Sequence, residues 1–136
     1  MIDFTTDFGL RAAKRLKEEY VAWLTTVAKN GMPEPNPVWF YWDGRDILIY
    51  SQPSARKLRN IVRNPNVSVN FQADAEGGSI VVLTGSASIQ KNPSQHDSRY
   101  LEKYREHIPK IGLTPETLAK SYSVLIRVSP NKLRGF

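Results

Sequence analysis

The sequence contains no cysteine, which excludes disulfide bonds, thiol catalysis and cysteine-based metal sites. No apolar run approaches the roughly 18 residues that a membrane-spanning helix needs. The first ten residues lack a basic stretch followed by an apolar one, so we expect no signal peptide and a cytoplasmic location. His96 and His107 are not spaced like metal ligands, and we interpret both as surface histidines.

The familiar motifs of phosphate binding and nucleophilic catalysis are also missing. There is no Walker-type loop, no Gly-x-Gly-x-x-Gly and no serine in a nucleophile-elbow pattern. Adjacent or helically spaced carboxylates such as Glu18 and Glu19 suit surface ion pairs. We therefore predict no catalytic side chain and no metal. If the protein is an enzyme, a bound cofactor supplies the reactivity.

The chain has 136 residues, which suits a single domain over 1–136. Nineteen Lys and Arg against 13 Asp and Glu give a net charge of +6. This surplus favours an anionic partner, although solubility alone would account for it equally well. Nucleic acid is the weakest candidate, because the basic and aromatic residues are compactly placed rather than spread along a stripe. We expect no nucleic-acid or membrane partner.

Hydrophobic periodicity predicts four helices and six strands. The helices are expected over 8–20, 53–64, 93–107 and 114–120. Asp7, Ser54 and Thr114 are the expected caps of the first, second and fourth helices. The expected apolar faces consist of Phe8, Ala12, Leu16 and Tyr20 in the first helix and of Leu58, Ile61 and Val62 in the second. The strands are expected over 20–28, 36–42, 46–51, 66–73, 79–90 and 122–128. Short turns join most strands, which favours a mostly β fold: a small antiparallel barrel of about six strands with peripheral helices.

Two strand features carry further information. Trp39, Phe40, Tyr41 and Trp42 are consecutive, so both faces of their strand must be covered. We take a second subunit as the cover and predict a homodimer. Gly85 inside a strand predicts a bulge or a close backbone approach. Because a six-stranded barrel is filled by its own side chains, a ligand would bind outside it or between subunits.

The segment from Tyr50 to Lys57 is a strand end, a turn and a helix start. Hydroxyls of Ser51 and Ser54 stand there with the cations Arg56 and Lys57. A helix N-terminus favours anions, and guanidinium and ammonium groups bind phosphate. The segment is therefore a candidate phosphate site, the alternative being a solvated basic helix face. Further along the helix, Arg59 and Arg63 would matter more for a ligand with several carboxylates.

Several of these pieces resemble the pyridoxamine 5′-phosphate oxidase-like split-barrel flavoproteins, especially their small coenzyme F420-dependent oxidoreductases. The matching residues, in order, are Trp23–Val27, Gly31, Pro37–Phe40, Trp42–Gly44, Tyr50–Pro53, Arg56–Lys57, Asn64–Ser68 and Gly85–Ala87. They cover residues 20 to 90, about half of the chain.

The resemblance implies a Greek-key-like, FMN-binding split β-barrel that forms a homodimer with cofactor sites at the interface. It implies an oxidoreductase that transfers hydride between F420, or alternatively FMN, and a small organic substrate. A non-catalytic module that binds or stores a flavin is the other possibility. The cofactor-binding residues implied are Pro37, Val38, Trp39, Phe40, Tyr50, Ser51, Gln52, Arg56 and Lys57.

One position departs from the vitamin-forming oxidases of this superfamily. They carry a glutamine in the strand that leads to the Gly-x-Ala, where this sequence has Ile80. The resemblance therefore does not point to a pyridoxamine phosphate oxidase activity.

Overall fold

The computed structural model describes residues 1–93 and 95–136. Seven strands form one antiparallel sheet in the order β2-β1-β5-β6-β7-β4-β3. The strands are β1 (Ala22–Val27), β2 (Pro33–Val38), β3 (Tyr41–Trp42), β4 (Ile47–Ser51), β5 (Asn66–Asn70), β6 (Val81–Lys91) and β7 (Val124–Gly135). The helices are α1 (Asp7–Glu18), α2 (Arg56–Arg63), α3 (Ser98–Lys103), η1 (Pro109–Ile111) and α4 (Pro115–Ser121).

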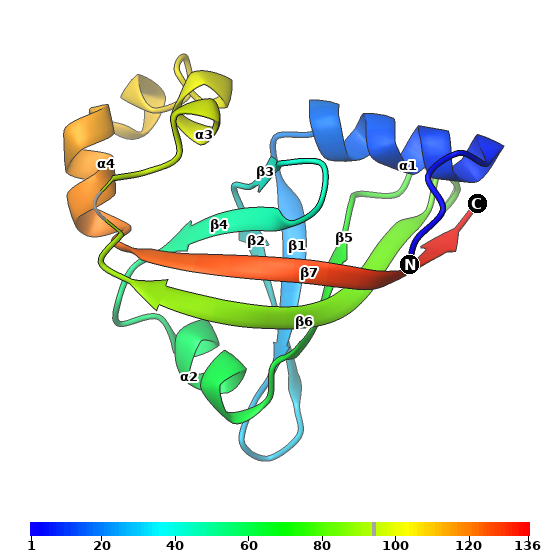
Figure 1. Cartoon of the computed structure of the whole chain (residues 1–136), viewed down its shortest axis with the longest axis horizontal. Helices are drawn as coiled ribbons and strands as arrows, with labels where there is room; N and C mark the ends of the chain where they lie inside the picture. Colours follow the sequence, from blue (N-terminus) through cyan, green and yellow to red (C-terminus); the bar gives the residue numbers. More distant parts are fainter. Residues whose placement is uncertain (94) are drawn as a thin grey trace.

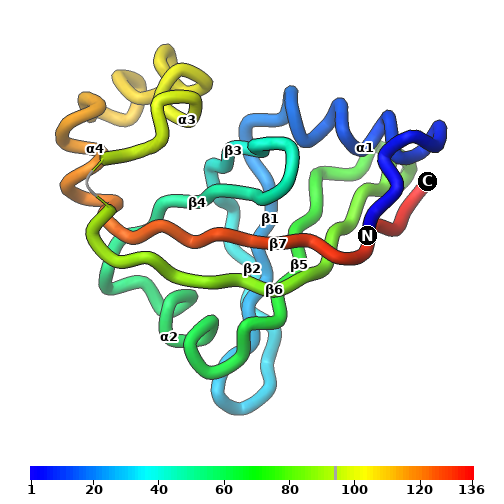
Figure 2. Tube along the Cα trace, viewed as in Figure 1, coloured from blue at the N-terminus to red at the C-terminus, as the bar shows by residue number. Residues whose placement is uncertain are grey.

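The long strands β6 and β7 cross the molecule side by side, and the helices lie around the sheet (Figure 1). The same path can be followed along the chain trace, where α2 lies at the opposite side of the sheet from α1, α3 and α4 (Figure 2). The prediction of a mostly β, antiparallel fold with peripheral helices is confirmed.

The sheet has seven strands because the predicted strand over 36–42 is broken. Its first part belongs to β2, which starts earlier, at Pro33, and its last part is β3. Pro33, Pro35 and Pro37 alternate along β2, which lies at an edge of the sheet. An edge strand tolerates prolines because the missing N–H groups face away from the neighbouring strand. Pro33 and Pro35 therefore lie inside the strand, although the predicted strand began only at residue 36.

Two apolar clusters occupy the two faces of β4, which is buried along its whole length. Ile47 and Ile49 belong to the large cluster inside the curved sheet, whereas Leu48 and Tyr50 belong to a smaller cluster beneath the α3–α4 segment. The smaller cluster consists of Leu48, Tyr50, Tyr100, Tyr104, Ile108, Leu118 and Leu125. The C-terminal helices thus form a second layer over β4 and β7.

These clusters also account for the aromatic run. Phe40 and Trp42 pack with the large cluster, and Trp39 and Tyr41 pack with the small one. The expectation that both faces are covered is confirmed, but the cover comes from the same chain. The run therefore no longer argues for a second subunit.

The first two helices differ from the sequence prediction at their ends. Thr6, not Asp7, caps α1, its side chain accepting a hydrogen bond from the Gly9 N–H at 2.9 Å. The helix ends at Glu18, which leaves Tyr20 outside its apolar face and 46% exposed. In α2, Ala55 occupies the cap position, where Ser54 was expected.

The apolar stripe of α2 is narrower than predicted. Leu58 and Ile61 are buried, but Val62 is 76% exposed. The predicted helix over 93–107 is reduced to α3, which Asp97 caps by accepting from the Arg99 N–H; position 94 lies outside the described residues. The predicted cap of α4 is confirmed, because Thr114 accepts from the Thr117 N–H.

The predicted close approach at Gly85 is confirmed. The pairing of β6 with β7 shifts between Thr84 and Gly85. A Cβ at Gly85 would lie only 2.2 Å from the carbonyl oxygen of Ser129. Any other residue would push β7 away, so glycine here is required by the neighbouring backbone.

The junction between β2 and β3 is held by one side chain from the C-terminal half. The hydroxyl of Tyr104 accepts the Phe40 N–H at 2.8 Å and lies 2.7 Å from the Tyr20 carbonyl oxygen, to which it donates. Its ring stacks on Trp39 with the ring planes 2° apart and the centroids 4.4 Å apart. Tyr104 is fully buried, so this contact ties the helical layer to the sheet edge.

We expect Tyr104→Phe to lower the free energy of unfolding by about 1–3 kcal/mol, because it leaves the buried Phe40 N–H without an acceptor. Urea denaturation measures the change. Tyr41→Phe is the matched control, since Tyr41 is only half-buried and contacts Arg99 through its ring. Equal effects of the two substitutions would show that the Tyr104 hydroxyl is not a special tie.

Candidate functional site

A pocket of about 270 Å³ lies between the end of β2, the end of β4, the start of α2 and the helical layer. Five of the nine predicted cofactor residues line it: Pro37, Val38, Trp39, Tyr50 and Lys57. The remaining wall comes from the C-terminal segment and consists of Tyr100, Ile111, Leu118 and Tyr122. Aromatic and aliphatic walls with one cation suit a planar ring that carries an anionic substituent.

Lys57 supplies the only cationic side chain of this pocket wall. It is half-buried, and burial lowers its pKa below the usual lysine value. Among the described residues, no carboxylate lies within ion-pair distance of its ammonium group. A partly desolvated cation without a counter-ion is a favourable position for a phosphate.

Four predicted residues do not reach the pocket wall. Phe40 is fully buried, and the Ser51 hydroxyl donates to the Gln52 carbonyl oxygen at 3.0 Å. Gln52 itself is exposed. Arg56 is ion-paired with Glu34 on the other side of α2. The structure thus brings Lys57 together with the predicted residues that have apolar or aromatic side chains, apart from Phe40. The polar residues Ser51, Gln52 and Arg56 lie outside the pocket wall.

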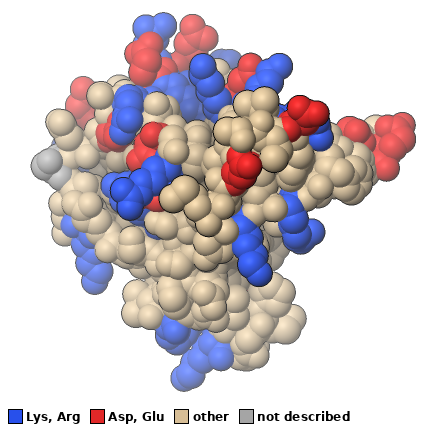
Figure 3. Space-filling view, turned by 45° about the vertical axis from the view of Figure 1, so that its right-hand side comes forward, with Lys and Arg blue, Asp and Glu red and all other residues tan. Residues whose placement is uncertain are grey.

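A second, basic groove of about 570 Å³ runs between the β1–β2 turn and α2. Arg56, Arg59 and Arg63 line it from one face of α2, and Lys29 lines it from the turn. In the face shown in Figure 3, acidic side chains lie in the upper half only, and the lower half, where α2 and the β1–β2 turn lie, shows basic ones.

The groove is only partly neutralised from within. Glu34 pairs with Arg56 and also accepts from the Asn60 side-chain amide at 2.8 Å. Arg63 donates a hydrogen bond to the side-chain carbonyl oxygen of Asn60 at 2.8 Å. Asn60 is buried, so it fixes the positions of both neighbouring charges. Arg59 and Lys29 have no ion pair among the described residues.

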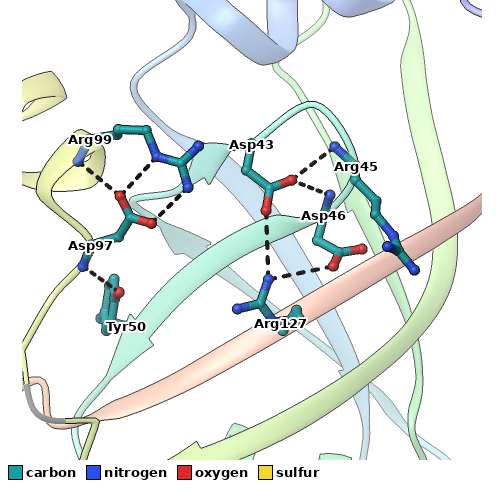
Figure 4. Close-up of polar contacts among 7 residues, drawn as sticks. All are labelled: Asp43, Arg45, Asp46, Tyr50, Asp97, Arg99 and Arg127. Carbon is teal, nitrogen blue, oxygen red and sulfur yellow. Dashed lines mark hydrogen bonds and ion pairs between the residues drawn. The ribbon is translucent and has the colours of Figure 1, made fainter.

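The wall of the pocket at Tyr50 is fixed from behind by residues that precede and begin α3. The Tyr50 hydroxyl accepts the Asp97 N–H at 2.8 Å, and Arg99 holds the Asp97 carboxylate with two hydrogen bonds (Figure 4). His96 stacks on the Tyr50 ring at a centroid distance of 3.9 Å. Burial raises the pKa of Tyr50, so the phenol stays neutral.

The nearby polar cluster at the β3–β4 hairpin is structural. Asp43 accepts the backbone N–H groups of Arg45 and Asp46, and Arg127 on β7 lies within 3.6 Å of the Asp43 carboxylate and 3.5 Å of the Asp46 carboxylate (Figure 4). These contacts confirm the predicted Asp-Gly turn, with Gly44 at a positive φ of 93°. They lie outside the pocket wall.

Sequence reasoning missed the four C-terminal residues of the pocket, Tyr100, Ile111, Leu118 and Tyr122. They lie 43 to 65 residues beyond Lys57, the last residue of the predicted site. The only local signal was the aromatic and aliphatic content of short helices. Helical periodicity shows that such a face is buried, but not which strand it covers.

The interpretation of both histidines as surface residues is wrong for His96. Its ring is 3% exposed, and its Nε2 lies 2.8 Å from the Tyr122 carbonyl oxygen. Its Nδ1 is buried with no hydrogen-bond partner among the described residues. His107 is half-buried and stacks on Tyr20. His96 therefore supports two pocket walls, Tyr50 and Tyr122, without lining the pocket.

The family model described as pyridoxamine 5′-phosphate oxidase matches residues 11–135. The chain belongs to this family. The predicted resemblance is confirmed over far more of the chain than the motifs that suggested it. No curated protein matches the chain in sequence. Among the described residues, no helix is long and apolar enough to cross a bilayer, and no three metal-ligating side chains gather.

Solved structures of the family share this fold. An F420 reductase is 25% identical with a TM-score of 0.72, covering 89% of this chain and 94% of its own. A FAD-binding protein from Mesorhizobium loti is 20% identical (TM-score 0.67; 91% and 90% covered). The heme storage protein HutZ from Vibrio cholerae is 17% identical (TM-score 0.66; 96% and 95% covered). The last two, both below 25% identity, show the fold alone.

His96 makes the stability of this family member sensitive to acid. Burial lowers its pKa in the folded state, so the unfolded chain takes up the proton first. We expect stability to be complete above about pH 6.5 and to fall as the pH drops towards the lowered folded pKa. Urea unfolding near neutrality and near pH 5 measures this loss.

His96→Gln should flatten that pH dependence, while His107→Gln should retain it. A pH dependence of stability that is lost in His107→Gln and kept in His96→Gln would contradict the assignment of the acid sensitivity to His96.

Proposed function

We propose that this protein is an oxidoreductase that binds the deazaflavin coenzyme F420 and transfers hydride between it and a small organic substrate. The observation that carries the proposal is the aromatic pocket with Lys57 at its wall, beside a basic groove on the other side of α2. The 25% identity to an F420 reductase over 89% of the chain supports it.

The residues present fit such a coenzyme in two parts. A pocket of about 270 Å³ is slightly below the usual range for a whole ligand, about 300–1,000 Å³, so it suits a ring rather than a complete nucleotide. Lys57 would hold the phosphate. Arg59, Arg63 and Lys29 would bind the carboxylates of the F420 tail, for which a single cation would be too few.

The bound coenzyme supplies the hydride chemistry. The chain's own residues position the ring and exclude water. Trp39 and Tyr50 are held in place by Tyr104 and His96 respectively, so these walls are preorganised. No carboxylate or imidazole lines the pocket in the described part of the chain. Hydride transfer fits such a wall, because it requires no proton acceptor on the protein.

FMN is the second candidate for the same pocket, because Lys57 can bind its phosphate equally well. A protein that stores the cofactor without turnover would use the same residues. The pocket has space for a ring and is not filled by its own aromatic side chains, which supports cofactor binding by either kind of protein. Anaerobic mixing of the reduced-coenzyme complex with candidate substrates, followed by visible absorption, separates an enzyme from a storage protein.

Lys57→Ala should weaken both F420 and FMN by about tenfold or more, because a charged hydrogen bond contributes about 1.5–3 kcal/mol. Isothermal titration calorimetry measures both affinities. Lys57→Glu should weaken binding further, by placing like charges together. Unfolding midpoints should hardly change, since Lys57 forms no ion pair among the described residues.

The double variant with Arg59→Ala and Arg63→Ala separates the two coenzymes: it should weaken F420 several-fold and leave FMN unchanged. Arg105→Ala, an exposed cation outside both cavities, is the matched control. Unaltered FMN and F420 binding by Lys57→Ala would contradict the phosphate site.

We also propose that the protein is a homodimer whose second copy covers the mouth of this pocket. The support is an apolar surface around the mouth. Tyr20 and Val21 are each 46% exposed and Trp23 is 37% exposed, and Trp23 lies opposite Pro37 in the sheet. Ile111, at the opposite wall, is 50% exposed. Contiguous exposed apolar side chains mark interaction surfaces.

Sedimentation equilibrium at micromolar concentration should give twice 15.5 kDa. Trp23→Glu should give the monomer mass with an unchanged circular dichroism spectrum, because the side chain is already partly exposed. A wild-type protein that sediments only as a monomer would overturn the dimer proposal.

A further inference from the structure

A cavity of about 500 Å³ lies between α1, β3 and α3, and it shares no lining residue with the cofactor pocket. Its walls include the aromatic side chains Tyr41 and Trp42 of β3. Lys17 lines it from α1 and Lys103 from α3. This volume falls within the range of small-molecule sites in proteins.

Lys103 is the unusual group of this cavity. Its ammonium group donates to the Phe40 carbonyl oxygen at 2.8 Å and lies 3.7 Å from the centroid of the Phe40 ring. The side chain is half-buried, and desolvation lowers its pKa to about 8. A lysine in such a position is normally paired with a carboxylate.

The surrounding charges leave Lys103 without such a partner. Glu102 on α3 is the one carboxylate of the cavity lining among the described residues, and it is ion-paired with Arg105 rather than with Lys103. Glu19, which follows the last residue of α1, is ion-paired with Arg15. Its negative charge raises the pKa of Lys103 by less than burial lowers it. No ion pair of Lys103 or Lys17 exists among the described residues.

Arg99 adds a further cation to the same wall, over the Tyr41 ring at 5.2 Å. Arg99 already forms an ion pair with Asp97, so its positive charge is partly neutralised. Burial raises the pKa of Tyr104, one of the phenols nearest the amine, so its hydroxyl offers no negative charge. The cavity therefore combines planar aromatic surfaces with an excess of positive charge.

We propose that this cavity is a second ligand site, which binds a small aromatic carboxylate with its carboxylate against Lys103 and Lys17 and its ring against Tyr41 and Trp42. The ligand's charge would take the place of the missing counter-ion, and its ring would cover two half-buried aromatics. The site is independent of coenzyme binding and goes beyond the proposed oxidoreductase activity.

Proton linkage gives the site a signature that packing alone would not produce. A bound anion favours the charged amine, so it raises the pKa of Lys103. Affinity should be full below about pH 8 and fall by about tenfold per pH unit above it, until the pKa of the bound form is reached. The Lys103 side-chain signals in lysine-labelled protein report this titration by NMR.

Benzoate is the probe, benzamide its neutral analogue and acetate its analogue without a ring. We expect benzoate to bind at pH 7 with a dissociation constant of about 1 mM or lower, and the two analogues at least about tenfold more weakly. Lys103→Gln, which keeps a donor for the Phe40 carbonyl, should lose benzoate binding. Lys103→Arg should keep it but lose the pH dependence.

Lys91→Gln is the matched control for the loss of one positive charge, because Lys91 is exposed and lines neither cavity. It should leave benzoate binding unchanged. The proposal is overturned if benzoate does not bind at pH 7, if its affinity is the same at pH 7 and about pH 9.5, or if Lys91→Gln weakens binding as much as Lys103→Gln does.

Discussion

The architecture depends on how the chain passes from β2 to β3. At Trp39 and Phe40 the strand breaks, so the Phe40 N–H has no strand neighbour and must find another acceptor. The Tyr104 hydroxyl is that acceptor, at 2.8 Å. Because Tyr104 comes from the C-terminal segment, its contacts couple the sheet edge to the helical layer. The candidate pocket lies between this junction and the helical layer, and its wall contains residues of both.

The two-sided burial of β4 follows from the same arrangement. Ile47 and Ile49 complete the interior of the curved sheet, while Leu48 and Tyr50 form the floor of the helical layer. A strand with one solvated face could not present Tyr50 to a ligand in a dry environment. The helical layer supplies that environment, and His96 and Asp97 hold the Tyr50 ring and hydroxyl from behind. Tyr50 thus belongs both to the small apolar cluster and to the wall of the candidate pocket.

Local chemistry made part of this predictable. Asp43-Gly44, Thr114 and Gly85 each specify backbone conformation through neighbouring atoms, and each was predicted correctly. The start of β2 at Pro33 was not predicted, because prolines are compatible with a strand only at the edge of a sheet, and the sequence does not show that β2 is an edge strand. Lys57 was predicted from its position at a strand–helix junction, and the structure places it in the pocket wall. The helical wall of the pocket was not found, because tertiary packing alone brings it to β4.

Lys57 and Lys103 are the cations on which the two proposed binding sites depend. Both amines are half-buried, both have a lowered pKa and neither is ion-paired among the described residues. Keeping a cation partly desolvated without a counter-ion is destabilising, and replacement by an apolar side chain of similar volume would often be tolerated. Lys103 binds the Phe40 carbonyl, whereas Lys57 borders the pocket that contains Trp39. An anion that binds beside either cation would therefore reduce the electrostatic cost that the free protein carries.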